Sequence, residues 1–247
     1  MKSAASTMAG LCRNPVGYAR FFSTLSAFRK RQIISARKLS VALEDVIPCF
    51  DDSSATTAFD AHYVYHTAWA VRILSQSRPA FHVDISSSLY FNALLSAFIP
   101  VRFYDFRPPV LKLSNLTCEH IDLSRLSFDS DSIASLSCMH VIEHIGLGRY
   151  GDPLDPEGDL RAAAELQRVL APGGELLMAT PVGRSRVCFN AHRIYRHAEV
   201  LAMFPWLQSK SFALITDDGT FMPEASPEMA DEQTYGCGCF RLVKAAA

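Results

Sequence analysis

Three aspartates, Asp84, Asp105 and Asp122, stand at or near the carboxyl ends of three short apolar segments. In an open parallel sheet, ligands bind in the crevice outside such strand ends. In dinucleotide-binding folds, an acidic residue about 20 positions after the first turn accepts hydrogen bonds from ribose hydroxyls, and Asp105 lies 21 residues after Asp84. We therefore expect Asp105 to bind a ribose, in a site whose carboxylates suit a cationic ligand. In the alternative interpretation, Asp84 and Asp122 only cap the turns that follow them.

A histidine-rich segment, HVIEH, occupies residues 140–144 directly after another apolar run. Neutral imidazole is available near pH 7, and a well-placed general base speeds a reaction by roughly 10²–10⁴-fold. We expect this base to be His140 or His144. His192 is a further candidate, and Glu143 is expected to orient one of these histidines.

The same five letters match H-x-x-E-H, the signature of the inverted zinc peptidases, in which two histidines on one helix face bind zinc and the glutamate is the base. That interpretation requires a helix. A strand-like run precedes the motif and Gly146, Gly148 and Gly151 follow it, so at most one turn can be helical. A zinc-dependent hydrolase is therefore the weaker alternative.

A second pair of histidines lies earlier in the chain. His62 and His66 are four residues apart in a predicted helix and share one of its faces, a spacing that can ligate a metal. The sequence offers no evident third ligand. We therefore interpret them as surface or site-lining histidines and expect no metal site.

A loop rich in glycine, proline and aspartate, GLGRYGDPLDPEG, spans residues 146–158. It is long enough to form a lid or a substrate wall at the ligand end of the sheet. A segment after the fifth predicted strand should emerge beside it. We expect the substrate-binding side chains in these two places to be Arg149, Tyr150, Asp152, Asn190 and Arg193. In the alternative interpretation the segment is an ordinary loop.

The elements that must position these residues follow from the alternation of apolar runs and helical periods. We expect strands at 81–85, 101–104, 118–121, 133–139, 175–180, 211–216 and 235–243, and helices at 58–77, 89–98, 156–170 and 192–203. Such alternation is typical of a mostly parallel sheet with helices on both faces. The last two strands have no helix between them, so we expect an antiparallel edge hairpin. The fold class is therefore α/β, with a doubly wound, seven-stranded sheet.

Charge sets the N-terminal region apart. The first 43 residues contain eight Lys or Arg and no acid, which leaves 16 basic and 25 acidic residues for the rest. Apolar positions between residues 18 and 46 follow a helical period. We expect a basic amphipathic helical extension over residues 1–50 and an α/β domain over 51–247. The extension fits three interpretations: a helix packed on the domain, a helix that docks on a membrane surface or a partner through residues 18–46, and a transit peptide.

The composition excludes several classes of protein. The longest stretch without a charged residue, 85–101, has 17 residues and four serines, too short and too polar for the ~20 apolar residues of a membrane-spanning helix. Seven cysteines without a C-x-x-C pair favour reduced thiols. We therefore expect a cytoplasmic protein, with any membrane contact peripheral and at the inner surface. An acidic domain also disfavours nucleic acid as a partner.

The succession of these motifs resembles a known superfamily. The strand-end aspartates, the segment SCMHVIEH at 137–144 and the helix ending in LAPGG at 170–174 are similar to the class I S-adenosylmethionine-dependent methyltransferases, over about residues 60–244. The stretches HVIEHIGLGRYGDPLDPEGD, FNAHRIY and YGCGCF resemble a narrower branch of it. The resemblance implies a Rossmann-like sheet, S-adenosyl-L-methionine as cofactor, and methylation of oxygen or nitrogen on a small-molecule or glycan acceptor.

The resemblance also implies roles for individual residues. The expected cofactor-binding residues, from the methionine part to the adenine, are Asp84, Ser86, Ser88, Asp105, Asp122 and Leu123, with Met139 and His140 as the floor near the sulfonium. The sequence departs from the family at one motif. The family usually has three glycines there, and this sequence has Ser86, Ser88 and Tyr90 instead. This departure supports a second hypothesis, a methyltransferase-like binding protein that has lost the chemistry.

Overall fold

The computed structural model describes residues 14–37, 39–50 and 52–246. The chain divides into two compact units, Met1–Phe59 and Asp60–Ala247. Residues 1–13 and Lys38, which belong to the predicted extension, lie outside the described residues. Within the described ranges we find no helix with the length and apolar character of a membrane span.

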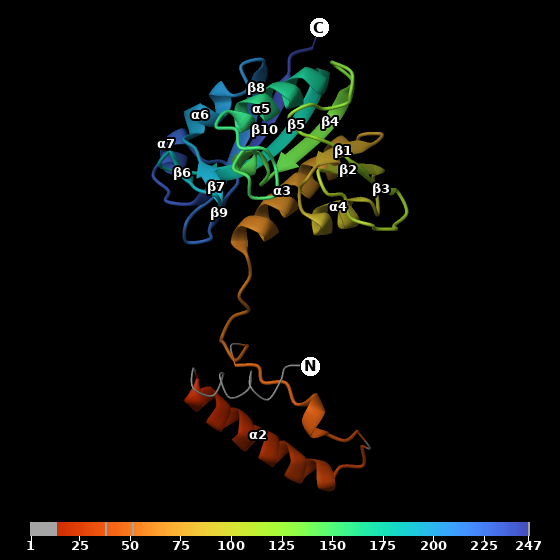
Figure 1. The fold of residues 1–247 in the computed structure, drawn as a ribbon, viewed down its shortest axis with the longest axis vertical. Helices are drawn as coiled ribbons and strands as arrows, with labels where there is room; N and C mark the ends of the chain where they lie inside the picture. Colours follow the sequence, from red (N-terminus) through yellow and green to blue (C-terminus); the bar gives the residue numbers. More distant parts are fainter. Residues whose placement is uncertain (1–13, 38, 51, 247) are drawn as a thin grey trace. The chain divides into compact units, whose positions relative to one another are not determined.

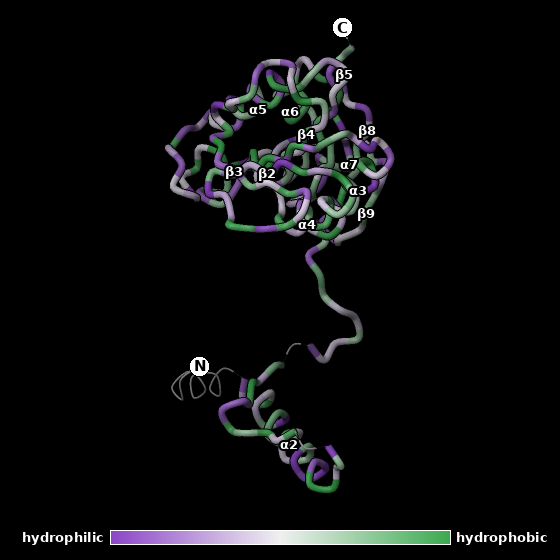
Figure 2. The backbone as a smooth tube through the Cα atoms, turned by 90° about the vertical axis from the view of Figure 1, so that its right-hand side faces the viewer, coloured by the Kyte–Doolittle hydropathy of each residue, from purple (hydrophilic) through white to green (hydrophobic). Residues whose placement is uncertain are grey.

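The N-terminal unit contains the helix α2 (Pro15–Ile33) and a short 3₁₀ turn, η1 (Leu43–Asp45). The side chain of Asn14 caps α2 by accepting the N–H of Gly17 at 2.9 Å, and proline at the first helical position fits this start. Apolar and polar residues alternate along α2, as the colours of the tube show (Figure 2). The predicted helical period extends to residue 46, but the helix ends at Ile33.

The second unit is built on one large sheet (Figure 1), in the order β3-β2-β1-β4-β5-β10-β8-β9. The strands are β1 (His82–Ile85), β2 (Val101–Asp105), β3 (Leu116–His120), β4 (Ile133–Met139), β5 (Leu170–Val182), β8 (Leu207–Ile215), β9 (Phe221–Met222) and β10 (Gly236–Lys244). The first five pair in parallel, and β10 pairs antiparallel with both β5 and β8. The predicted doubly wound, mostly parallel sheet with an antiparallel edge is confirmed, and the two-residue strand β9 is an eighth strand that the sequence did not indicate.

Helices cover both faces of this sheet. One apolar core lies under α3 (Ala61–Ser77) and α4 (Leu89–Leu95). The other lies under α5 (Gly158–Val169), α6 (His197–Ala202) and α7 (Pro227–Asp231). The strands β4 and β5 between them are buried along most of their length, as expected for central parallel strands that face helices on both sides.

The predicted helix over residues 192–203 is wrong in its first part. Residues His192–Ile194 form the strand β7, which pairs with β6 (Arg186–Cys188), and α6 begins only at His197. Tyr195 also bridges to Val182 of β5. Pairing with residues distant in sequence therefore overrides the helical period of this segment.

The topology brings four predicted site segments to one edge. Because β1, β2, β3 and β4 are parallel, their carboxyl ends lie side by side. Asp105 is paired with His120 at the ends of β2 and β3, and Asp84 is paired with Ser137 near the ends of β1 and β4. The strand order reverses between β1 and β4, and such a switch point is where open α/β sheets bind ligands.

Candidate functional site

A cavity of about 240 Å³, here called the first cavity, lies outside the carboxyl ends of β1, β2 and β4. It brings together residues from five separate segments of the sequence. The predicted site residues that line it are Ser86, Asp105, Asp122, Leu123, His140, His144, Tyr150 and Asp152. The remaining cofactor-site candidates, Asp84, Ser88 and Met139, are not among its lining residues.

The two aspartates of the first cavity use one oxygen each to hold their own turns. Oδ1 of Asp105 accepts the N–H of Arg107 at 2.7 Å, and Oδ1 of Asp122 accepts both the N–H and the hydroxyl of Ser124 at 2.8 Å. Among the described residues, no hydrogen bond engages Oδ2 of either carboxylate. Each therefore combines a fixed position with an acceptor that is available to a ligand.

Ser86 stands where the methyltransferases that the sequence resembles usually have their first glycine. Its φ is +56°, in the left-handed region that glycine adopts without steric cost. The backbone here therefore has the conformation of a glycine turn although the residue is serine. The Ser86 N–H donates to the carbonyl of Tyr104 at 2.8 Å, which fixes the turn at the wall of the first cavity.

Replacing Ser86 with glycine is expected to raise the free energy of unfolding by up to about 1 kcal/mol, because it removes the Cβ that disfavours positive φ. The greater freedom of the unfolded chain partly offsets this gain. The matched control is Ser88→Gly, because Ser88 has a φ of −57° and the change there is expected only to cost stability. Urea unfolding of the three proteins measures both differences, and equal losses in the two variants would contradict the role of φ.

Asp84 lies beneath the first cavity and is fully buried. Its Oδ1 accepts the N–H of Ser87 at 3.0 Å and the amide of Asn92 at 2.8 Å, and Oδ2 accepts the hydroxyl of Ser137. Ser137 also contacts Nε2 of the buried His82 at 2.8 Å. The structure thus supports the turn-holding interpretation of Asp84, which positions the first cavity from below.

Burial raises the pKa of Asp84 to about 6, although its hydrogen bonds with Ser137, Ser87 and Asn92 oppose that rise. Between about pH 4 and about pH 6 the folded protein keeps this proton and the unfolded chain releases it. The free energy of unfolding therefore falls as the pH rises through this window, and Asp84 accounts for about 3 kcal/mol of that fall. Above about pH 6 the contribution of Asp84 no longer changes with pH.

The variant Asp84→Asn isolates this effect, because asparagine keeps an oxygen for Ser87 and Asn92 and carries no charge. We expect the wild-type protein to lose more stability than the variant between pH 4 and pH 7. Urea unfolding at both pH values measures the difference. Parallel losses in the two proteins would show that Asp84 does not titrate in this window.

A second, larger cavity of about 550 Å³ adjoins the first. The two share three lining residues, His140, His144 and Tyr150. The second cavity is also lined by side chains from α3, the loop 146–158 and the C-terminal half, among them His62, Tyr63, Arg149, His192 and Tyr235. A ligand in the first cavity and a ligand in the second would therefore meet at the histidines.

The segment HVIEH does not form the helix that the zinc-peptidase signature needs. It contains only the 3₁₀ turn η2 (Ile142–His144). Nδ1 of His140 lies 2.9 Å from the buried Glu143 carboxylate, and Nε2 lies 3.3 Å from Sγ of Cys237. Nδ1 of His144 lies 2.6 Å from the carbonyl of Ala191. The Nδ1 atoms of the two histidines thus have different partners, while Nε2 of His144 lies 3.8 Å from the same Glu143 carboxylate.

These contacts decide the protonation of the pair formed by His140 and Glu143. Burial would lower the pKa of His140, but the contacts with Cys237 and Glu143 raise it. Burial would likewise raise the pKa of Glu143, and the contact with His140 lowers it. Both nitrogens of His140 are engaged, whereas the carbonyl contact of His144 makes Nδ1 its donor and leaves Nε2 as the acceptor.

Two of the predicted substrate residues shape the loop 146–158. The carboxylate of Asp152 accepts the N–H groups of Gly146, Gly148 and Tyr150; burial opposes ionisation, and these bonds hold its pKa below the usual value. The buried guanidinium of Arg193 donates to the carbonyls of Ile145, Asp155 and Pro156. Both side chains thus fix the wall of the site.

The remaining substrate candidates divide between the second cavity and the surface. Arg149 and Tyr150 line the second cavity, and Nη1 of Arg149 donates to the Ala191 carbonyl at 3.0 Å. Asn190 is exposed and lines neither cavity.

Three residues at the second cavity were not predicted from the sequence. Tyr63 and Tyr235 line it, and Cys237 contacts the lining residue His140. A signal for each was present, because Tyr63 stands beside the noted His62 and the other two belong to the stretch YGCGCF. The pairing of β10 with β5 brings that stretch to the site, and such a long-range pairing is not readable from local pattern.

Solved methyltransferase structures share this fold. The N-methyltransferase NodS from Bradyrhizobium japonicum WM9, in complex with S-adenosyl-l-homocysteine, aligns with a TM-score of 0.51 and 15% identity over 78% of this chain and 92% of its own. The 1,6-didemethyltoxoflavin-N1-methyltransferase of Burkholderia thailandensis, with bound 1,6-didemethyltoxoflavin and S-adenosylhomocysteine, aligns with a TM-score of 0.51 and 11% identity over 73% of this chain and 79% of its own. At these identities the likeness shows the fold, which is the Rossmann-like fold of these methyltransferases.

Sequence comparison adds one match. Residues 113–216 match the family described as Caenorhabditis protein of unknown function, DUF268. That segment contains the HVIEH turn and the whole loop 146–158. Among curated proteins, no sequence matches significantly.

Proposed function

We propose that this protein is an S-adenosylmethionine-dependent methyltransferase that methylates oxygen or nitrogen on a small-molecule or glycan acceptor. The observation that carries the proposal is the first cavity, which lies at the switch point of the sheet and is lined by Ser86, Asp105, Asp122 and Leu123. The fold that it shares with NodS and the toxoflavin methyltransferase supports it.

In this proposal each part of the first cavity takes one part of the cofactor. Asp105 accepts the ribose hydroxyls through its available oxygen, and Asp122 with Leu123 takes the adenine. The turn at Ser86 faces the methionine part, and Asp84 and Ser88 hold that turn from outside the cavity. Met139, which is buried, supports the floor at His140 near the sulfonium.

The acceptor binds in the second cavity, where Arg149, Tyr150 and His192 contact it. Methyl transfer requires the acceptor atom in line with the sulfonium methyl, so orientation supplies much of the rate gain. We assign the general base to His144, because its Nε2 is an acceptor and it lines both cavities. Glu143 orients His140, whose two nitrogens are engaged.

Calorimetric titration with S-adenosylmethionine and S-adenosylhomocysteine tests the proposal. Binding of both, with methyl transfer to an acceptor, is the expected result. The second candidate function, a binding protein that has lost the chemistry, is favoured by serine at position 86 and predicts binding without transfer. A folded protein that binds neither compound at millimolar concentration would contradict both functions.

The proposal also covers the location of the protein and the partners that it binds besides the cofactor and the acceptor. We propose a cytoplasmic protein, for which the six free cysteines among the described residues are support. We also propose that the basic segment 18–46 docks on an anionic membrane surface or on a partner. Deletion of residues 1–43 is expected to abolish such association and to leave cofactor binding intact.

A further inference from the structure

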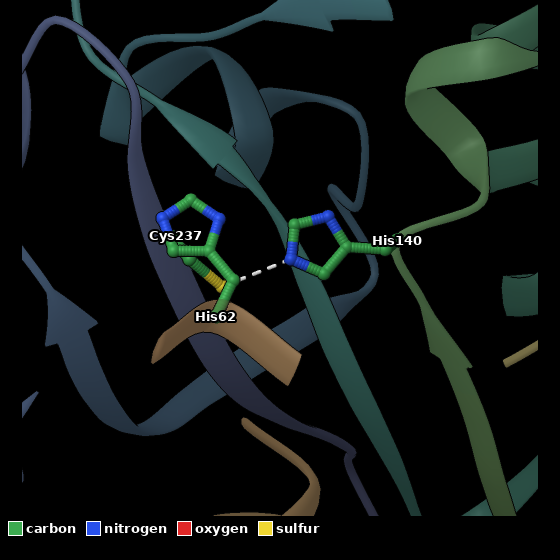
Figure 3. Close-up of side chains that lie close together, drawn as sticks. All are labelled: His62, His140 and Cys237. Atoms are coloured by element: carbon green, nitrogen blue, oxygen red, sulfur yellow. Dashed lines mark hydrogen bonds between the residues drawn. The ribbon is translucent and has the colours of Figure 1, made fainter. Parts of the chain in front are cut away.

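Three side chains that could ligate a metal converge where the second cavity meets the sheet. His62 comes from α3, His140 follows β4 and Cys237 belongs to β10 (Figure 3). Their nearest ligand atoms all lie within 4.8 Å of one another, and Nε2 of His140 is 3.3 Å from Sγ of Cys237. In a tetrahedral zinc site, nitrogen and sulfur ligands are separated by roughly 3.5 Å, so this pair already has the required spacing.

The rings of both histidines are held by neighbouring groups. Nδ1 of His140 contacts the buried carboxylate of Glu143 at 2.9 Å, and the ring of His62 stacks on the ring of Tyr235 with a centroid distance of 5.2 Å. Metal-binding histidines almost always have a carboxylate or a backbone carbonyl on the other ring nitrogen, because it fixes the tautomer and the ring orientation. Nδ1 of His140 is therefore held by a carboxylate while its Nε2 faces the thiol of Cys237, and the ring of His62 is held by stacking.

A neighbouring side chain gives an independent indication. His66 is fully buried, and its ring lies 5.0 Å from the ring of His140. Nδ1 contacts the carbonyl of His62 at 2.6 Å, while Nε2 is buried without a hydrogen-bond partner among the described residues. Buried polar atoms without partners are rare, so Nε2 of His66 is an unsatisfied polar atom in the residue next to His140 in space.

We propose that His62, His140 and Cys237 bind one Zn²⁺ ion. Imidazole and thiolate ligands together favour zinc, and three protein ligands with a fourth, open position are the arrangement of catalytic zinc sites. The open position faces the second cavity, which His62 and His140 line. Zinc takes the place of the proton shared between His140 and Cys237.

The zinc site has a consequence for the class of acceptor, and this part of the inference rests on the proposed methyltransferase function. A hydroxyl oxygen of the acceptor coordinates the zinc and loses its proton to Nε2 of His144. The bond from that oxygen to the methyl carbon forms as the bond from the sulfonium sulfur to the methyl carbon breaks. The electron pair of the broken bond stays on sulfur, which leaves S-adenosylhomocysteine. Zinc bound there would lower the pKa of an acceptor hydroxyl, which must lose its proton to be methylated, so the site suits hydroxyl acceptors.

The test measures metal in the full-length protein. After equilibration with zinc and dialysis, elemental analysis is expected to find an equimolar amount in the wild type and a loss in His62→Gln and Cys237→Ser. The matched control is Cys138→Ser, because Cys138 is equally buried but faces the opposite core of the sheet. The control is expected to keep its zinc.

Cobalt substitution keeps the test decisive if a variant does not fold. Cobalt in the wild-type protein is expected to give a sulfur-to-cobalt charge-transfer band and the intense visible bands of a tetrahedral site. A folded wild type without zinc, zinc retained in Cys237→Ser, or cobalt without the sulfur band would each overturn the proposal. Titration with S-adenosylhomocysteine in parallel separates the two proposals, since zinc uptake without nucleoside binding would overturn only the methyltransferase function.

Discussion

Replacing His144 with glutamine is expected to slow methyl transfer by roughly 10²–10⁴-fold, the contribution of a general base. His144 lines both cavities, and its Nδ1 contacts the carbonyl of Ala191 at 2.6 Å. This contact makes Nδ1 the donor of the neutral ring, so the lone pair lies on Nε2, which is 3.8 Å from the Glu143 carboxylate. Glutamine retains a donor to the Ala191 carbonyl and cannot act as the base.

The release of S-adenosylhomocysteine measures this loss, with the acceptor that gives turnover in a screen of small hydroxyl compounds. The affinity for S-adenosylhomocysteine is expected to stay within a factor of about two, because the base acts on the acceptor side. The matched control is His120→Gln, an exposed histidine that lines neither cavity. Turnover in His144→Gln equal to that of the control would exclude His144 as the base.

Replacing Asp105 with asparagine is expected to weaken binding of S-adenosylhomocysteine by roughly 10–100-fold. A hydrogen bond to a charged acceptor contributes about 1.5–3 kcal/mol, and each 1.4 kcal/mol is a factor of about ten in affinity. Asparagine keeps one oxygen for the N–H of Arg107, which Asp105 accepts at 2.7 Å. The turn should therefore survive, and the loss should fall on the ribose hydroxyls.

Isothermal titration calorimetry gives the two affinities directly. Asp129→Asn provides the control, because Asp129 is an exposed aspartate on the same domain and lines neither cavity. It removes the same charge without touching the site. If both variants bind as tightly as the wild type, Asp105 does not hold the ribose.

The sequence predicts the fold and the residues of the first cavity, because both depend on local patterns of residues. Alternating apolar runs and helical periods indicate strands and helices, and parallel strands place their carboxyl ends at one edge. Asp105, Asp122 and the turn at Ser86 therefore meet in one cavity, as expected. The turn keeps a glycine conformation at Ser86, whose N–H donates to the carbonyl of Tyr104.

Some partners of the buried groups do not follow from local sequence. Asp84 bonds the turn, as the alternative interpretation expects, but it also bonds Ser137 of β4, and Arg193 bonds the carbonyls of the loop. Charged groups that leave water need several partners at once. The packing of the whole domain supplies those partners, so composition and spacing do not reveal them.

The strands and helices, the strand-edge aspartates and the histidine turn follow from local patterns, because each depends on a short run of consecutive residues. The roles of the histidines depend on long-range packing. Cys237 reaches His140, 97 residues away in the chain, only because β10 inserts antiparallel between β5 and β8. His62 reaches the same place from α3, packed on that face of the sheet. A cluster built from three distant segments exists only when the strand order and the helix packing are both fixed.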